Sequence, residues 1–478
     1  MGSYKQLAVD GRQVKMLFSP RQAQLLLLGI MLLIAVGMLL GIKVYLMLAA
    51  ALLLTAICTR WRGKSWQKIG VAVGKGLYRS RHVVLILALI SILIGLWKQN
   101  GTLATLIYYG FAFIRPEVFL VRVFVLSSLV SMLLGTAVGT ASTIGIVLMG
   151  LAQSMGMPGG VVAGAIVAGA FVGDRSAPTS GPLHLIATTT GVRSEELLRY
   201  VFSTLIPTYL LSLGFFYLLG LLYRPEAVDP GTIRGFQELL AGHYPVALYL
   251  LLPTLLLLAL AVCRLEIIPN LLFTLTATFI CSLYGGFSPA AIFQSALWGY
   301  SPAADLPFAA VLSGGGLLSF RAILLVVMAA MSLTSLLEDT GVIHQAMASV
   351  LDHIHTVPQL ILATSLFSIL GVAVAFTQTV AIVVPGTVLQ STYQRLEVDR
   401  LVLGRTIADT GVAASGIVPW SSAAMSPALV LGVPVLEFVP YAAYCWLSPL
   451  VTNIFGLLGW VKRNRLPLDK GREGEAAR

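Results

Sequence analysis

Residues 168–187 read AGAFVGDRSAPTSGPLHLIA and place a charged, hydroxyl-rich segment inside an otherwise apolar chain. The residues on both sides are strongly apolar, so Asp174 and Arg175 stand in the middle of a hydrophobic run. Pro178 and Pro182 lack the backbone N–H that a continuous helix needs. Irregular backbone at membrane depth is tolerated only where it is buried in protein or lines a cavity, because lipid cannot satisfy free N–H and C=O groups. The stretch therefore predicts a broken helix at a buried site.

The composition of the 478-residue chain is typical of a polytopic membrane protein. Hydrophobic residues make up 57% of it and charged residues 11%, and the mean hydropathy is +0.89. These values lie outside the range of soluble domains. Since a helix needs about 20 apolar residues to cross the hydrocarbon, the apolar runs between residues 22 and 460 predict an all-α polytopic membrane protein with 14 candidate membrane segments, several of them short enough to be re-entrant.

Positive charge gathers near the ends of the apolar runs. Residues 60–82 hold seven Lys or Arg and no acid, and the N-terminal segment and the C-terminal tail are also basic. Cytoplasmic loops carry such an excess. We therefore expect both termini and the 60–82 loop in the cytoplasm. The net charge of +11 is a topology signal and predicts no nucleic-acid partner.

Signatures of several other functions are missing from the sequence. It contains no GxxxxGK[ST] motif, so we expect no nucleotide and no ATP-driven transport. It contains no HExxH motif and no arrangement of Ser, His and Asp that indicates catalysis, so we expect neither an enzyme nor a cofactor. The four cysteines stand in or beside apolar runs without paired spacing, which argues against disulfides and a zinc site.

The chain contains a weak internal repeat. Residues 135–150, GTAVGTASTIGIVLMG, and residues 371–386, GVAVAFTQTVAIVVPG, agree at seven of 16 positions. Downstream of them come GDRSAPTSG with Asp174 and ADTGVAASG with Asp409, and the two aspartates are almost as far apart in the chain as the two glycine-flanked segments. This register predicts matching positions for Asp174 and Asp409. The alternative is chance likeness among membrane helices rich in Gly, Ala and Val.

The order of the spans predicts that the second repeat is inverted relative to the first. Residues 151–160 carry no charge and are expected outside, whereas their counterpart around 391–405, with Arg395, Arg400 and Arg405, is expected inside. Interrupted helices in inverted repeats indicate a secondary transporter with its site near the bilayer midplane. The expected division is a basic N-terminal segment with two transmembrane helices (1–82), repeat 1 (83–223), connecting loops with two helices (224–319), inverted repeat 2 (320–460) and a cytoplasmic basic tail (461–478).

The polar residues of both interruptions are candidate ligands for a cation. An aspartate inside the membrane is costly, which marks it as functional. The pKa of a buried carboxylate depends on its surroundings, so a proton and a small cation can compete for the same oxygens, and such competition is sufficient for antiport. Hard oxygen ligands suit an alkali ion and no transition metal. We therefore expect Na⁺ at Asp174, at Asp409 or at both. The ion- and proton-binding candidates are Asp174, Asp409, Ser176, Thr179, Ser180, Thr140, Ser142, Thr143, Thr377, Gln378, Thr379, Ser415, Ser421 and Ser422.

These candidates also have a structural interpretation. Asp174 could instead pair with a basic residue and hold two helices together, and single hydroxyls on membrane helices often serve helix–helix contacts. Arg175 could reach the interface, neutralise another acid or bind an anionic substrate. His184 and Trp420 are further candidates for a substrate contact or a charge partner, and His184 could equally be a satisfied structural residue.

Several of these motifs resemble the NhaC family of Na⁺/H⁺ antiporters. They are NGTLATLIYYG from Asn100, GTAVGTASTIGIVLMG from Gly135, GDRSAPTS from Gly173, EDTGVI from Glu338 and RTIADTGVAASGIVPWSSAAM from Arg405. The resemblance covers about residues 85–460. It implies Na⁺ and H⁺ as transported ions in the lipid of a bacterial inner membrane, and its re-entrant hairpins would bring the number of membrane segments to about 11–14. It also implies inverted repeats, re-entrant hairpins and discontinuous helices, as in the wider ion-transporter superfamily, and a homodimer, because such transporters often dimerise.

One position departs from the family's pattern. Many members read GDKxSPxSDTT, with a second acid after the serine, where this chain has Gly181 followed by Pro182 and Leu183. Asp174 and Asp409 then remain as the acids of the site, and the identity of the ion and the stoichiometry stay open. The resemblance implies export of Na⁺, with Li⁺ as a further candidate, in exchange for H⁺ entry. The alternative is an ion-coupled carrier or exchanger of organic acids or amino acids.

Overall fold

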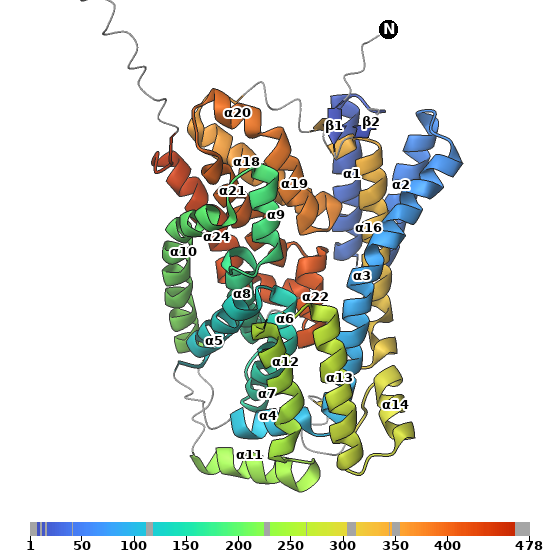
Figure 1. The fold of residues 1–478 in the computed structure, drawn as a ribbon, viewed down its shortest axis with the longest axis vertical. Helices are drawn as coiled ribbons and strands as arrows, with labels where there is room; N and C mark the ends of the chain where they lie inside the picture. Colours follow the sequence, from blue (N-terminus) through green and yellow to red (C-terminus); the bar gives the residue numbers. More distant parts are fainter. Residues whose placement is uncertain are drawn as a thin grey trace, which may run out of the picture.

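The computed structural model describes residues 7–9, 12–14, 17–40, 42–110, 118–223, 230–263, 265–303, 312–343, 345–346 and 354–463. Apart from a hairpin of β1 (Leu7–Val9) and β2 (Arg12–Val14), the regular structure of the described chain is helical (Figure 1). Most of the expected basic tail, from residue 464 on, lies outside the described residues.

Many of the described helices are long and apolar enough for a membrane. Five qualify as spans by length and composition, or up to eight if each of three sharply bent helix pairs is one span. Six shorter apolar helices accompany them in the described chain. The protein is thus a multi-pass, all-α membrane protein with discontinuous helices, as the composition predicted. The number of crossings stays a prediction.

The N-terminal part extends further as helix than the sequence predicted. α3 has 34 residues and is about 51 Å long at 1.5 Å per residue, which exceeds the hydrocarbon thickness of about 30 Å. The basic residues from Trp66 onward therefore lie on a helix, and the expected boundary at residue 82 falls inside α3. Arg79 forms an ion pair with Glu338 at 2.6 Å, and Lys64 pairs with Asp339. The first helices are α1 (Pro20–Leu39), α2 (Val44–Trp61) and α3 (Trp66–Gln99).

The first half of the core, residues 102–222, contains helices that stop and restart. Gly135 ends α5 with a positive φ of 69°, which favours glycine, and the chain restarts as a helix at Ala137. The helix after Ala137 contains one π-helical segment, η3. The elements are α4 (Thr102–Gly110), α5 (Phe119–Leu134), α6 (Ala137–Thr140), η3 (Ala141–Gly145), α7 (Ile146–Ser154), α8 (Gly159–Ser176), α9 (Gly181–Thr190) and α10 (Ser194–Leu222).

The connecting region is more helical than expected. The sequence predicted two helices between residues 224 and 319, and the described residues form four α-helices there, because shorter apolar and amphipathic segments also fold as helices. They are α11 (Pro230–His243), α12 (Leu252–Val262), preceded by the 3₁₀ turn η4 (Leu248–Leu251), α13 (Ile267–Tyr284) and α14 (Pro289–Trp298).

The second half of the core again contains interrupted helices. α18 begins with a capping box of Thr356 and Gln359 and ends at Phe376, a non-glycine residue with a φ of 59°. The elements are η5 (Leu317–Phe320), α16 (Arg321–Asp339), α18 (Val357–Ala375), α19 (Gln378–Val388), α20 (Gln390–Arg395), α21 (Arg400–Ile407), η6 (Ala408–Val412, π-helical), η7 (Ala413–Ile417, 3₁₀), α22 (Ser422–Leu431), α23 (Val435–Phe438), η8 (Val439–Tyr441) and α24 (Ala443–Leu457).

Two broken helices correspond element by element at one constant spacing. The starts of α8 and of the continuous segment α21–η6–η7 are a certain number of residues apart in the chain. The ends of these two helices are the same number of residues apart, and so are the starts of the restarted helices α9 and α22. The same spacing also separates the capping residues Ser180 and Ser421, and Gly191 and Gly432, which both end the restarted helices with a φ of 70°. We call this alignment, in which Ser180 matches Ser421, the cap register.

The repeat is therefore real, but the register predicted from the sequence is wrong. That register matched Asp174 with Asp409, whereas the cap register does not bring these two residues to equivalent positions. Local likeness of small apolar residues produced the predicted register. The caps and breaks of the helices define the true one, because they fix where each backbone segment begins and ends.

The two broken helices run in opposite directions. In Figure 1, α9 lies above α8, whereas α22 lies below α21. The chain therefore passes upward through the first broken helix and downward through the second, which is the arrangement of an inverted repeat. The exact limits of the repeats as domains stay a prediction.

Candidate functional site

Asp174 lies in the last turn of α8, where breaks from both halves of the core meet. Its side chain is 6% exposed. Its Oδ1 accepts a hydrogen bond from the backbone N–H of Ala137 at 3.2 Å, directly after the break between α5 and α6. Its Oδ2 accepts from Nε2 of Gln378 at 2.9 Å, directly after the break between α18 and α19. Both donors are neutral, and Asp174 has no ion pair with any described residue.

Gln378 joins Asp174 to the second broken helix. The same Nε2 that donates to Asp174 donates to Oγ of Ser415 at 2.8 Å. Ser415 in turn donates to the carbonyl of Val412 at 2.6 Å. In the cap register, Ser415 is the residue that matches Asp174. The centre of the core therefore holds one carboxylate from the first half and one hydroxyl from the second.

Two serines explain why both helices break where they do. Ser180 donates to the carbonyl of Asp174 and accepts from the N–H of Leu183 at 3.1 Å. Ser421 donates to the carbonyl of Ser415 at 2.5 Å and accepts from the N–H of Ala424 at 3.0 Å. Each serine thus satisfies one carbonyl freed at the end of one helix and caps the start of the next. The polar backbone at the break is thereby stabilised within the protein.

Helix starts face the carboxylate from both halves. Ala137 and Gln378 are the first residues of α6 and α19. The start of a helix carries a partial positive charge from its free N–H groups. The site can therefore hold a negative charge without a permanently charged partner.

Arg175, the next residue, points into a different set of neighbours. Its guanidinium donates to Tyr444 at 2.6 Å and to Thr204 at 2.8 Å, and it forms an ion pair with Asp409. Its weaker contacts are with Ser448 at 3.3 Å and the carbonyl of Val201 at 3.2 Å. Of the roles considered from the sequence, the structure shows neutralisation of another acid.

Asp409 does not occupy the place that the sequence register assigned to it. It lies in the π-helical segment η6, and the break of that helix comes later, after Ile417. Its side chain is fully buried against Arg175. In the cap register its counterpart is Ala168 of α8. Asp409 and Asp174 therefore belong to two different contacts of the core, one with Arg175 and one with Gln378.

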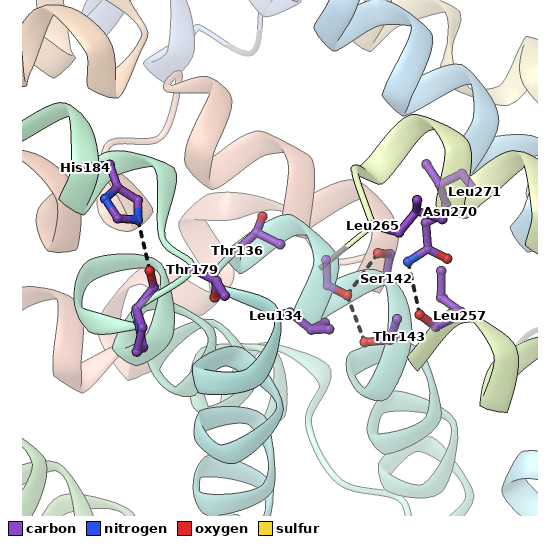
Figure 2. Close-up of a pocket in the computed structure, with 12 residues that line it drawn as sticks. Leu134, Thr136, Ser142, Thr143, Thr179, His184, Leu257, Leu265, Asn270 and Leu271 are labelled. Atoms are coloured by element: carbon purple, nitrogen blue, oxygen red, sulfur yellow. Dashed lines mark hydrogen bonds between the residues drawn. The ribbon is translucent and has the colours of Figure 1, made fainter. Parts of the chain in front are cut away.

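A cavity of about 340 Å³ lies beside the breaks of the first half. Thr136 and Thr179, from the two breaks, line it together with Asn270 of α13 (Figure 2). Oγ1 of Thr179 is buried and has no hydrogen-bond partner among the described residues. His184, at the cavity's edge, contacts Ser194 at 3.1 Å and the carbonyl of Pro178 at 2.9 Å. No Lys or Arg is among the described residues that line the cavity.

Other predicted ligands from the first half form hydrogen bonds within their own helix. The hydroxyls of Thr140, Ser142 and Thr143 donate to carbonyls three or four residues earlier. Ser176 donates to the carbonyl of Val172. Ser142 and Thr143 also line the cavity (Figure 2), whereas no contact of Thr140 or Ser176 with the Asp174 side chain or the cavity is found in the described chain.

Predicted ligands from the second half mostly shape the breaks. Thr377 caps α19 by accepting from the N–H of Thr379 at 3.3 Å. The backbone N–H of Ser422 donates to the carbonyl of Phe376 at 2.9 Å. Nε1 of Trp420 donates to the carbonyl of Ala373 at 2.7 Å. These contacts tie the two breaks of the second half together.

Several residues of the site were not predicted from the sequence. Ala137 contributes only a backbone N–H, and the signal for it was the preceding glycine and threonine of the break. Tyr444, Ser448 and Thr204 contact Arg175, but they stand on ordinary apolar helices, and nothing in their spacing marks them. Gly181, which stands where the resemblance implied a second acid, is exposed at the start of α9, and nothing lies within 4 Å of a Cβ added there.

Comparisons with known proteins support the resemblance seen in the motifs. Residues 169–460 match the Na⁺/H⁺ antiporter family. The chain is 30% identical to the Na⁺/H⁺ antiporter NhaC of Alkalihalophilus pseudofirmus, over 91% of this chain and 95% of that protein. It is 29% identical to NhaC of Bacillus subtilis, over 94% and 99% of the two chains. It is also 29% identical to the arginine/ornithine antiporter ArcD of Halobacterium salinarum, over 92% of each.

Proposed function

We propose that this chain, which belongs to the Na⁺/H⁺ antiporter family, exchanges Na⁺ for H⁺ across a bacterial inner membrane by competition of the two cations for the carboxylate of Asp174. Entry of protons would drive export of Na⁺. The family's relatives include transporters named for Na⁺/H⁺ exchange and one named for amino-acid exchange.

The environment of the Asp174 carboxylate carries this proposal. The carboxylate is buried between breaks of both halves, and its two described hydrogen-bond donors are a backbone N–H and a side-chain amide. A neutral amide can turn its oxygen toward a bound cation, whereas an arginine would have to be displaced. Since only one cation at a time can neutralise the charge, Na⁺ and H⁺ bind in alternation.

The oxygens around Asp174 suit an alkali ion. The hydroxyl of Ser415 accepts a hydrogen bond from the same amide that donates to Asp174. Carboxylate, hydroxyl and carbonyl oxygens are hard ligands. Within the described chain, no group of three or more His, Cys, Asp or Glu could hold a metal ion.

A second candidate function is the ion-coupled exchange of a small organic acid or amino acid. The cavity of about 340 Å³ favours it, because this volume exceeds the needs of a single Na⁺. The engagement of Arg175 with Asp409 speaks against an organic anion bound by that arginine. In this second function the cavity is the substrate site.

The orientation in the membrane follows from charge. β1, β2, α20 and the turn between α2 and α3 lie at one end of the molecule, and α11 and α14 lie at the other (Figure 1). The first end carries exposed Arg60, Arg62 and Lys68, so it is assigned to the cytoplasm. Both termini then face the cytoplasm, and a homodimer remains part of the proposal by analogy with related transporters.

Everted membrane vesicles test the function directly. With a pH gradient established by respiration and followed by a fluorescent dye, addition of Na⁺ alone is expected to dissipate the gradient. Vesicles from cells that lack the protein are the control. Dissipation only after addition of malate, lactate, arginine or ornithine would reject the first function in favour of the second.

A further inference from the structure

The described part of the chain buries a second charged group next to the Asp174 site. It consists of Arg175, Asp409 and Arg405 and is called the buried charge group below. The side chains of Arg175 and Asp409 have no exposed surface, and Arg405 is 1% exposed. Charges at such depth are costly unless they are paired. The sequence predicted Arg405 in a cytoplasmic loop, and this prediction was wrong. Arg405 lies in α21, where aromatic rings instead of water surround its guanidinium.

We propose that Asp409 is a positioning residue that neutralises Arg175, and that this pairing protects the affinity of Asp174 for Na⁺ and H⁺. In this view Asp409 is not a ligand of the transported ion. The inference rests on the proposed function, since it assigns ion binding to Asp174, and it adds a role for the charge beside that carboxylate.

Asp174 and Arg175 are neighbours in the chain, but their side chains contact different parts of the core. Asp174 turns toward Ala137 and Gln378, on α6 and α19. Arg175 turns toward α10, α24 and η6, and its hydrogen-bond partners include none of the residues that donate to the Asp174 side chain. Arg175 and Asp174 are consecutive residues of α8, and this adjacency places the permanent positive charge of Arg175 near the carboxylate of Asp174. Without a counter-charge, Arg175 would repel any cation approaching Asp174.

The correspondence of the two halves gives an independent argument. In the cap register, Ser415 matches Asp174 and contacts the same amide of Gln378. Asp409 matches Ala168, an apolar residue in the middle of α8. The fold therefore does not call for an acid at the position of Asp409, and the acid there contacts Arg175.

Arg405 sets the charge balance of the group. Its guanidinium lies 5.1 Å from the ring of Tyr200 and 5.6 Å from the ring of Phe455, and it interacts electrostatically with Asp409. Its Nε and Nη2 have no hydrogen-bond partner among the described residues. The formal charge of the buried charge group is thus +1. Replacing Asp409 by Asn raises it to +2, and replacing Arg175 by Gln as well returns it to +1.

Transport kinetics of three variants in proteoliposomes test the inference. We would measure the Na⁺ KM, the maximal rate and the pH of half-maximal activity for Asp409→Asn, Asp409→Glu and the double variant Arg175→Gln/Asp409→Asn. One added unit charge within several Å, at an effective dielectric constant of about 20, changes binding roughly tenfold or more. We expect Asp409→Asn to raise the Na⁺ KM by about that factor and to move the pH profile toward acid.

The charge-conserving variants are expected to recover affinity. Neither Asp409→Glu nor the double variant changes the net charge of the buried charge group. Both should therefore keep a Na⁺ KM within about threefold of the wild type. A purely structural role would lower the amount of inserted protein or the maximal rate and leave the Na⁺ KM and the pH profile unchanged.

Three results would overturn the inference. They are an unchanged KM in Asp409→Asn, a double variant that is as impaired as Asp409→Asn, and a double variant that does not accumulate in the membrane. If Asp409→Asn itself does not accumulate in the membrane, the Na⁺ KM of the double variant alone tests the inference. Failure of the proposed function is distinguishable, because wild-type protein would then show no Na⁺-driven proton flux at all.

Discussion

The side-chain amide of Gln378 lies 2.9 Å from the carboxylate of Asp174, although 204 residues separate them in the chain. Gln378 starts a helix in the second half of the core, and Asp174 ends one in the first half. This contact therefore joins the two inverted halves at the position where the ion is proposed to bind. The Asp174 carboxylate accepts hydrogen bonds from both halves, from Ala137 in the first and from Gln378 in the second.

Replacing Asp174 by Asn is expected to abolish exchange. The substitution keeps the volume and removes both the proton site and the charge that attracts Na⁺. Na⁺-dependent dissipation of a pH gradient in everted vesicles should fall to the level of vesicles without the protein. Asp174→Glu, which keeps the charge on a longer side chain, should shift the Na⁺ KM and the pH of half-maximal activity together. The control is Glu437→Gln, the same acid-to-amide change at an exposed position. Wild-type Na⁺ flux in Asp174→Asn would reject the mechanism.

Replacing Gln378 by Ala is expected to weaken Na⁺ binding without abolishing transport. The variant loses the donor shared by Asp174 and Ser415. A hydrogen bond to a charged group contributes about 1.5–3 kcal/mol, so the Na⁺ KM should rise by roughly ten- to hundredfold. The same kinetic assay with Gln394→Ala, at an exposed position of α20, is the matched control. Equal KM values in the two variants would show that the amide does not serve the site.

The close approach of α5 and α8 predicts a strong effect of one methyl group. A Cβ on Gly173 would collide with the backbone carbonyl of Ser131. Gly173→Ala must therefore push α8 away from α5, and overpacking of this kind costs about 1–3 kcal/mol. The control is Gly181→Ala, where nothing lies within 4 Å of the added Cβ. Thermal unfolding in detergent should show a lower midpoint for Gly173→Ala alone. Equal midpoints would contradict the packing described.

The proposed orientation predicts which surface positions a reagent can reach. In a cysteine-free background, Arg62→Cys after α2 should resist an impermeant thiol reagent in intact cells. Glu238→Cys on α11, at the opposite end of the molecule (Figure 1), should be labelled. Both positions are exposed, and both should react after the membrane is permeabilised. Labelling of position 62 alone in intact cells would reverse the orientation.

Much of the fold could be predicted from local sequence, because it depends on local chemistry. Composition indicated a multi-pass helical protein, and Asp174, Pro178 and the hydroxyls around them indicated a broken helix, which the structure shows between Ser176 and Gly181. Proline removes a donor and serine caps a helix wherever they stand in the chain. The existence of a repeat could also be predicted, since both halves carry the same kind of break.

The partners of the charged residues depended on tertiary structure. The sequence register paired Asp174 with Asp409, whereas the fold pairs Asp409 with Arg175 and links Asp174 to Gln378. A side chain in the last turn of a helix points to a neighbour chosen by helix packing, and the neighbours of Arg175 come from positions 26 to 273 residues away. Which helices pack together depends on many weak apolar contacts summed over the whole core, and no short motif contains that information. The sequence by itself therefore determined the kind of helix break, through its glycines, prolines and capping serines, and only the tertiary structure decided which carboxylate is held by neutral donors at the breaks and which one neutralises an arginine.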